Sequence, residues 1–155
     1  SRAILLQALH VSYTPGGGAV GTTPGPIRIT GTASGGQKIV YGTVMEDGTT
    51  ARIATGSQTP TLQLGAVTAS QKLYATLHLI AFSGFTSINV IVESDNAGAF
   101  TTPTTRLSFT NLTAVGSEYA APVAGAITDD WWRTTWTLNG VGPGSATLIV
   151  AVGIK

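Results

Sequence analysis

Short segments with two-residue periodicity, each ended by Gly or Pro, constrain this chain more than any other feature of its sequence. The clearest runs from Leu73 to Phe82, where the side chains alternate strictly and both faces are largely apolar. Such alternation is typical of β-strands, because successive side chains of a strand point to opposite faces of a sheet. A strand that is apolar on both faces belongs in the middle of its sheet.

Turn residues separate about nine or ten such segments, which predicts an all-β chain. Residues 68–79 also have near-helical spacing, but the strict alternation within them favours a strand. Asp47-Gly48 predicts a tight hairpin whose second arm is 49–54, and the Ala- and Gly-rich stretch 115–127 is expected to be an irregular crossover. Further strands are expected at 3–13, 27–32, 37–46, 61–64, 87–94, 106–110, 131–138 and 146–154.

This order of strands and turns indicates a single antiparallel β-sandwich, of which a jelly roll is one form. The length of 155 residues suits one domain, spanning 1–155, with a core that needs no disulfide or metal. A Gly- and Pro-rich loop at about 14–26 is expected to be exposed and to reach outward.

The composition excludes several classes of function. The chain has no Cys, which removes thiol nucleophiles and Cys-ligated zinc, and its net charge of +1 offers no basic surface for nucleic acid. No apolar run is long enough for a membrane span, and the start of the chain is interpreted as a first strand rather than a signal peptide. We therefore expect a soluble protein made in the cytoplasm. Charged residues make up only 10% of the chain, so its surface suits repeated protein–protein contact.

Catalytic and metal sites find no support in the sequence. His10 and His78 are the only histidines, and both fall in expected strands without a nearby carboxylate. The acidic residues lie at turns or strand ends, and 95–98 lacks the ligand spacing of a calcium loop. Neither a nucleophile elbow nor a phosphate-binding loop occurs. The prediction is a protein without enzymatic activity, cofactor or metal.

Three Trp within six residues form the sharpest local feature. By alternation Trp132 and Trp136 share one face, and Trp131 takes the other. A flat aromatic platform for sugar rings is one interpretation. The favoured one places Trp132 and Trp136 in the core and Trp131 at an interface, where Trp is a preferred anchor. The interface candidates are Leu5, Leu6, Trp131, Arg133 and Ile154.

The C-terminal half, roughly 71–155, resembles small virion proteins of tailed bacteriophages. The resemblance lies in the residue pattern of the segments and in their order along the chain. The composition is also similar, since it is rich in Gly, Thr and Ala, contains no Cys and has few charged residues. The residues that carry it are 73–84, 88–94, 106–110, 128–133 and the final apolar strand.

The resemblance implies a structural protein present in many copies in the virion, as a homo-oligomer that contacts other virion proteins. The first expectation is a capsid decoration protein bound to the major capsid protein. The second is a tail-tube or other tail subunit bound to neighbouring tail subunits, and such a subunit usually carries a helix beside its sandwich. A carbohydrate-binding module built on the Trp cluster is the alternative from another class.

Overall fold

The computed structural model describes residues 1–5, 8–14, 28–33 and 39–155, and these form two compact units. The larger unit comprises 1–5 and 40–155, and the smaller one comprises 6–39. The described residues contain strands and no helix, which confirms the all-β prediction. In particular, no helix of the described part is long and apolar enough to cross a membrane.

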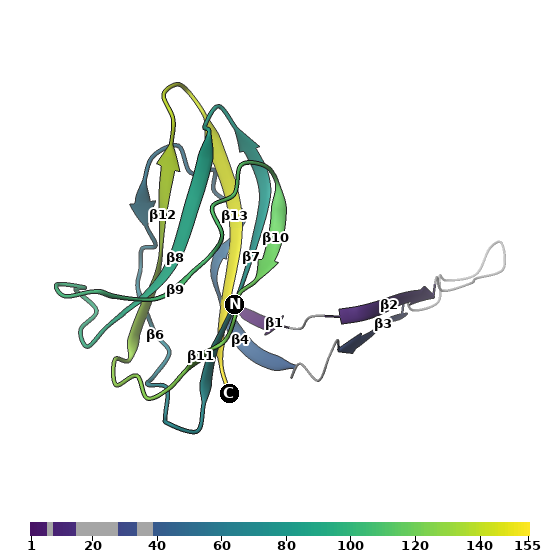
Figure 1. Ribbon diagram of the computed structural model, residues 1–155, viewed down its shortest axis with the longest axis vertical. Helices are drawn as coiled ribbons and strands as arrows, with labels where there is room; N and C mark the ends of the chain where they lie inside the picture. Colours follow the sequence, from purple (N-terminus) through teal and green to yellow (C-terminus); the bar gives the residue numbers. More distant parts are fainter. Residues whose placement is uncertain (6–7, 15–27, 34–38) are drawn as a thin grey trace. The chain divides into compact units, whose positions relative to one another are not determined.

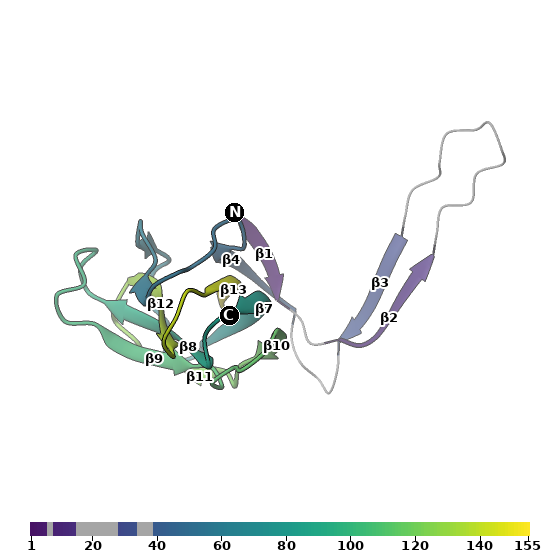
Figure 2. The same cartoon turned by 90° about the horizontal axis from the view of Figure 1, so that it is seen from above.

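The larger unit is a sandwich of two antiparallel sheets (Figures 1 and 2). One sheet, here the β13 sheet, has the order β1-β4-β13-β7-β10, and β11 also pairs with β7. Its strands are β1 (Arg2–Leu5), β4 (Val40–Asp47), β7 (Lys72–Ser83), β10 (Gly116–Tyr119), β11 (Val123–Ala124) and β13 (Ser145–Ile154).

The other sheet, here the β12 sheet, has the order β5-β12-β8-β9, and β6 also pairs with β12. Its strands are β5 (Gly56–Ser57), β6 (Leu62–Gln63), β8 (Ser87–Asp95), β9 (Thr104–Ser108) and β12 (Trp131–Asn139). The prediction of an antiparallel β-sandwich is therefore confirmed.

The strand order is that of a jelly roll. Strand β4 pairs with β13, β5 and β6 pair with β12, β7 pairs with β10 and β11, and β8 pairs with β9. These are the pairs of one long antiparallel ribbon whose end lies between β8 and β9. Rolling this ribbon brings β7 against β13 and β8 against β12, which closes the two sheets.

The core lies between the sheets and follows the alternation of the sequence. On β7, residues 73, 75, 77 and 79 are buried, and β7 is hydrogen-bonded on both sides, to β13 and to β10 and β11. This confirms the central strand that the alternation predicted. The neighbouring strand β13 contributes Leu148, Val150 and Val152, and the facing strands β8 and β12 contribute Ile88, Val90, Val92, Trp132 and Trp136.

Two local predictions differ from the structure. The apolar stretch 3–13 forms two strands, β1 and β2 (Ala8–Thr14), rather than one. The hairpin expected at Asp47-Gly48 was wrong, because 49–54 does not pair with β4: β4 pairs with β1 through 40–43 and with β13 through 42–47, and Arg52 forms an isolated bridge with Ala146 of β13. The turn itself forms: the Asp47 carboxylate accepts hydrogen bonds from the Thr49 N–H at 3.0 Å and the Thr49 hydroxyl at 2.6 Å.

The smaller unit contains an antiparallel hairpin of β2 and β3 (Arg28–Ala33). Its register aligns Tyr13 with Ile29 and Ser12 with Thr30. Apart from Thr14, the loop predicted at about 14–26 lies outside the described residues.

Candidate interaction surface on strands β1 and β4

The edge of the β13 sheet exposes two large apolar side chains that face each other across the strands. Ile4 of β1 and Tyr41 of β4 are register partners, and they are 61% and 76% exposed. They line a hollow of about 320 Å³ on the surface. We call this surface the β1–β4 patch, defined by Arg2, Ala3, Ile4, Tyr41 and Gly42.

The patch continues the face of the sheet that forms the core. Thr43 pairs with Val152 of β13, whose side chain is buried between the two sheets. Tyr41 lies two residues before Thr43 and therefore shares that face. The exposure of Tyr41 and Ile4 follows because the β12 sheet does not cover the β13 sheet as far as its β1–β4 edge. Within 1–5 and 40–155, the patch is thus on the core side of its sheet but is not covered by the other sheet.

The opposite face of the same two strands is buried. Leu5 and Val40 are register partners with exposed fractions of 1% and 0%, and they pack with Tyr74 and Ala151 in a second apolar cluster. Burial on this side anchors β1 to the rest of the sheet. The patch therefore rests on a fixed support.

Two paired glycines allow this close packing. A Cβ atom on Gly42 would overlap the carbonyl oxygen of Val152 and lie 2.7 Å from Leu5 Cδ1, and one on Gly153 would lie 2.7 Å from Val40 Cγ1. Such separations are shorter than any van der Waals contact. Glycine at these two positions lets Leu5 and Val40 lie directly on the backbone of the sheet.

Two further properties distinguish the patch from the rest of the described surface. Within the larger unit, 1–5 and 40–155, no other two large exposed apolar residues are register partners, and isolated ones are normal on any protein. Within the described part of the chain, β1 pairs with β4 alone, so it is an edge strand. Backbone N–H and C=O groups on such an edge can pair with a strand of another chain.

The predicted interface residues of the terminal strands lie elsewhere. Leu5 is buried in the second apolar cluster, so its neighbour Ile4 presents the exposed side chain. Leu6 falls outside the described residues. Ile154 is partly buried and packs against the main core.

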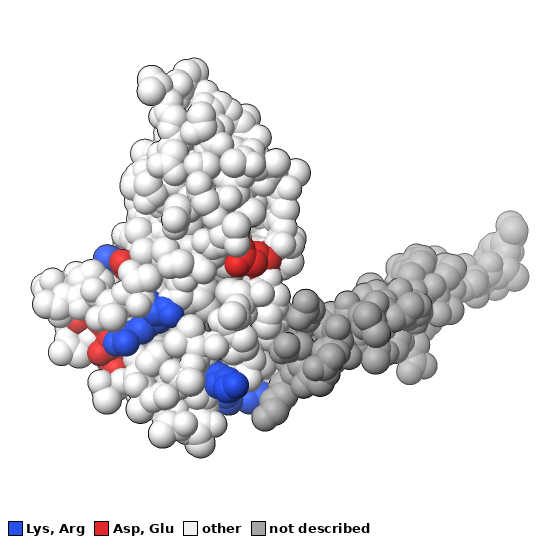
Figure 3. Space-filling view, viewed as in Figure 1, with Lys and Arg blue, Asp and Glu red and all other residues white. Residues whose placement is uncertain are grey.

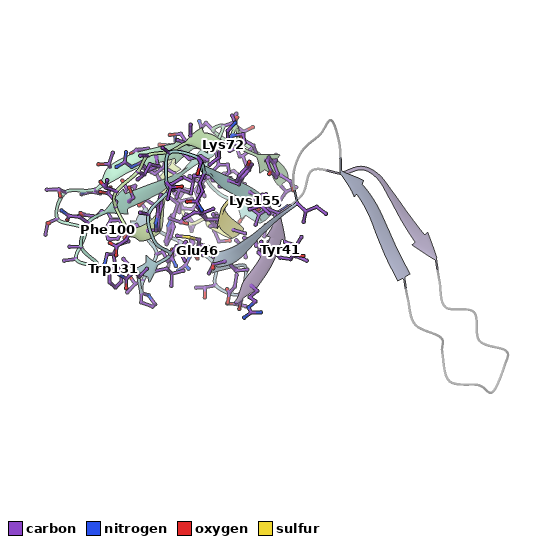
Figure 4. All side chains as sticks on the ribbon, turned by 90° about the horizontal axis from the view of Figure 1, so that it is seen from below. Tyr41, Glu46, Lys72, Phe100, Trp131 and Lys155 are labelled. Atoms are coloured by element: carbon purple, nitrogen blue, oxygen red, sulfur yellow. The ribbon has the colours of Figure 1, made fainter. Side chains whose placement is uncertain are left out.

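The Trp cluster lies mainly in the interior. Trp132 and Trp136 are 0% and 4% exposed, and their indole N–H groups donate hydrogen bonds to the carbonyl oxygens of Gly65 at 2.8 Å and Ala54 at 2.9 Å. The favoured interpretation of these two residues is confirmed. Trp131 is partly buried against Gly98, where an added Cβ would lie 3.0 Å from its ring (Figure 4).

Arg133 is engaged within the chain. Its Nε donates to Glu93 Oε2 at 2.8 Å, and its guanidinium group lies 4.4 Å from the centre of the Phe100 ring. Phe100 comes from the loop between β8 and β9, on the same side of the sandwich as Trp131 (Figure 4). This loop thus covers part of the outer face of the β12 sheet.

A second hollow of about 320 Å³ lies beside β4 and is lined mostly by polar groups. Its buried carboxylate, Glu46, is paired with Arg52, whose guanidinium group lies 4.5 Å from the centre of the Trp136 ring. Glu46 Oε1 and Arg52 Nε have no hydrogen-bond partner, but they are the remaining arms of the same carboxylate–guanidinium pair. The two charges of this pair therefore compensate each other inside the hollow.

The remaining titratable groups serve local structure. Hydrogen bonds from Ser94 and then from Arg106 hold the pKa of Asp129 below its usual value, and burial raises the pKa of Tyr119. His78 lies on an exposed strand face with Nδ1 2.8 Å from Ser117 Oγ. Among the described residues, no group of three or more His, Asp and Glu is placed to hold a metal ion.

Sequence reasoning missed Ile4 and Tyr41. Alternation shows that Ile4 and Leu5 face opposite sides, but not which of them is covered. The signal that could have found the patch is a pair of large apolar residues in the two strands that flank a long Gly- and Pro-rich insertion.

The chain matches no protein-family model and no curated protein.

Proposed function

We propose that this protein is a structural subunit of a tailed-phage virion, a capsid decoration protein that stabilises the head through contacts made in many copies. One observation carries the proposal: within the sandwich, a sheet edge presents the paired apolar side chains Ile4 and Tyr41 without a second layer. A surface of this kind is the usual mark of a protein–protein contact.

The energetics support assembly through this edge. Fully burying an aliphatic side chain such as Ile4 stabilises a contact by about 1.5–3 kcal/mol, and Tyr41 adds a large aromatic surface with a polar tip suited to an interface. The gain is modest for one contact, but a shell repeats it in every subunit.

The charge distribution supports the same proposal. Charged residues make up 10% of the chain. Figure 3 shows none of them on the half of the sandwich that carries the β7–β8 and β12–β13 turns. A surface with few charges loses little hydration when it is covered by a neighbour. The sugar-platform alternative receives less support, because two of the three Trp rings are inside the sandwich.

A matched pair of variants tests the role of the patch. Tyr41→Ser should weaken self-association in sedimentation-velocity runs over a concentration series. Ile53→Ser should leave it unchanged, although Ile53 is 73% exposed, close to the 76% of Tyr41. Equal behaviour of the two variants would contradict a specific role for the patch.

Electron microscopy of the purified wild type, alone and mixed with undecorated phage heads, tests the assembly itself. Discrete particles that add density to the heads would support decoration. Tubes or stacked rings formed by the protein alone would instead assign it to the tail. A monomer that neither polymerises nor binds heads would overturn the structural proposal.

A further inference from the structure

We infer that the β2–β3 hairpin of one copy packs on the β1–β4 patch of a second copy. The inference rests on the proposed function, because it names the segment that provides the contact between subunits. Four observations on the described residues lead to it.

The first concerns the hairpin itself. The described part of 6–39 forms a two-stranded ribbon of β2 and β3. A two-stranded hairpin is at best marginally stable in water, because it has no second layer on which to bury a face. A ribbon of this kind gains stability when it packs on another surface.

The second concerns the residue pattern along the ribbon. Tyr13 is aligned with Ile29 and Val11 with Gly31, whereas the alternate positions align Ser12 with Thr30. Thr14–Arg28 and His10–Thr32 continue the polar set. The register therefore separates an apolar set of positions from a polar one, which is the pattern of a ribbon with one face covered.

The third concerns where cover is needed. Ile4 and Tyr41 are 61% and 76% exposed, and the assembly that we propose provides a second copy to cover them. The insertion that contains the hairpin begins after Leu5 and ends before Val40, which are register partners one position from Ile4 and Tyr41. Every copy thus carries both a patch and a hairpin, and a contact between the patch of one copy and the hairpin of another is of the head-to-tail type, which closes into a discrete ring when the rotation between copies allows it.

The fourth concerns charge. The segment 6–39 contains two of the eight basic residues, Arg28 and Lys38, and none of the seven acidic ones, so its formal charge is +2. The remainder of the chain has six basic and seven acidic residues, a formal charge of −1. The sandwich as a whole therefore attracts a hairpin weakly at long range, whereas the patch itself carries the basic Arg2, so the contact there rests on apolar residues rather than on charge.

A variant without the hairpin gives the first test, with the full chain as reference. Because Leu5 and Val40 are paired, an Asn-Gly turn can join them directly in place of 6–39. We expect the full chain to self-associate in sedimentation velocity and the variant to be monomeric. A variant that associates as strongly as the full chain would overturn the inference and leave the proposed function standing. A full chain that stays monomeric at every concentration would also overturn the inference, whereas the proposed function fails only if that monomer does not bind phage heads either.

Point variants in the full chain keep the test valid if the deletion variant does not fold. Val11→Asp introduces a charge into the apolar set, and Ser12→Asp places the same charge at the next position, in the polar set. We expect Val11→Asp to raise the dissociation constant for self-association by about tenfold or more, and Ser12→Asp to change it less. Equal effects would contradict a ribbon covered on its apolar positions.

Disulfide trapping identifies the partner surface. The chain has no Cys, so Val11→Cys and a heavier, tagged Tyr41→Cys each carry a single thiol. On mixing and mild oxidation, a mixed disulfide that exceeds the statistical share would place the hairpin on the patch of another copy. Homodimers alone, or no disulfide, would overturn this pairing.

Discussion

On β12, the indole rings of Trp132 and Trp136 lie inside the sandwich, and each N–H group donates to a backbone carbonyl of the same chain. On β1 and β4, the side chains of Ile4 and Tyr41 lie at the surface. They are on the face of the β13 sheet whose central strands are covered by the β12 sheet. The two regions are similarly apolar but differ in the extent of the opposite sheet. The two Trp residues, which stand out in the sequence, stabilise the fold, whereas the less conspicuous Ile4 and Tyr41 remain exposed for contact with another molecule.

The largest expected effect on stability concerns the buried Trp residues of β12. Trp132→Ala should lower the free energy of unfolding by about 3–5 kcal/mol, because it empties a fully buried site and removes the donor to Gly65. Trp131→Ala is the control, since Trp131 is only partly buried, and it should lose about 1 kcal/mol. Guanidinium denaturation measures both, and equal losses would show that the two rings do not differ as described.

An intermediate effect tests whether the β1–β4 edge is a fixed support. Gly42→Ala should destabilise the protein by about 1–3 kcal/mol, because the added Cβ overlaps the backbone of β13 and lies 2.7 Å from Leu5 Cδ1. Gly116→Ala is the matched control in an edge strand, because its added Cβ would meet only Ala114 O, at 3.9 Å. If thermal unfolding shows the same stability for both variants, the edge yields easily and the patch is not held in place.

The smallest effect concerns the ion pair between Arg106 of the β12 sheet and Asp129. Among the described residues, the β1–β4 patch has no such ion pair. Ser94 Oγ and Arg106 Nη2 donate to Asp129 Oδ2 at 2.7 and 2.8 Å, and they lower the pKa of Asp129 below its ordinary value of 3.8. The unfolded chain therefore takes up this proton first as the pH falls. The stabilisation is complete above the ordinary value and is lost as the pH falls through the lower folded pKa.

Asp129→Asn should accordingly lower stability slightly at neutral pH, and the difference from the wild type should shrink as the pH falls through the folded pKa of Asp129. Urea denaturation at pH 7, 4 and 3 measures the difference. A parallel decline in wild type and variant would mean that Asp129 does not contribute to acid sensitivity.

The sequence predicted the structure correctly wherever the pattern that mattered lay within a single strand. The alternation of 73–82 predicted a central strand, and that of 131–138 placed Trp132 and Trp136 on the buried face. Both predictions hold because side-chain direction in a strand depends on the local backbone alone.

Features that depend on pairing could not be predicted in this way. Asp47-Gly48 specifies a turn, but its residues do not tell that β1 and β13 occupy both edges of β4. The expected strand 3–13 divides into β1 and β2, although no Gly or Pro occurs in that stretch to mark the division. Ile4 and Tyr41 become a surface because the other sheet ends before them, which no local pattern records.

The jelly-roll strand order also has a consequence for the time course of folding. Strand β13 is the last of the described strands along the chain, yet it lies between β4 and β7 in the middle of its sheet. During synthesis, β4 and β7 therefore emerge long before the strand that joins them, and the ribosome must complete 145–154 before the sheet can close. Contacts so distant in sequence form slowly, and the unpaired edges of the nascent chain are exposed to aggregation for that interval.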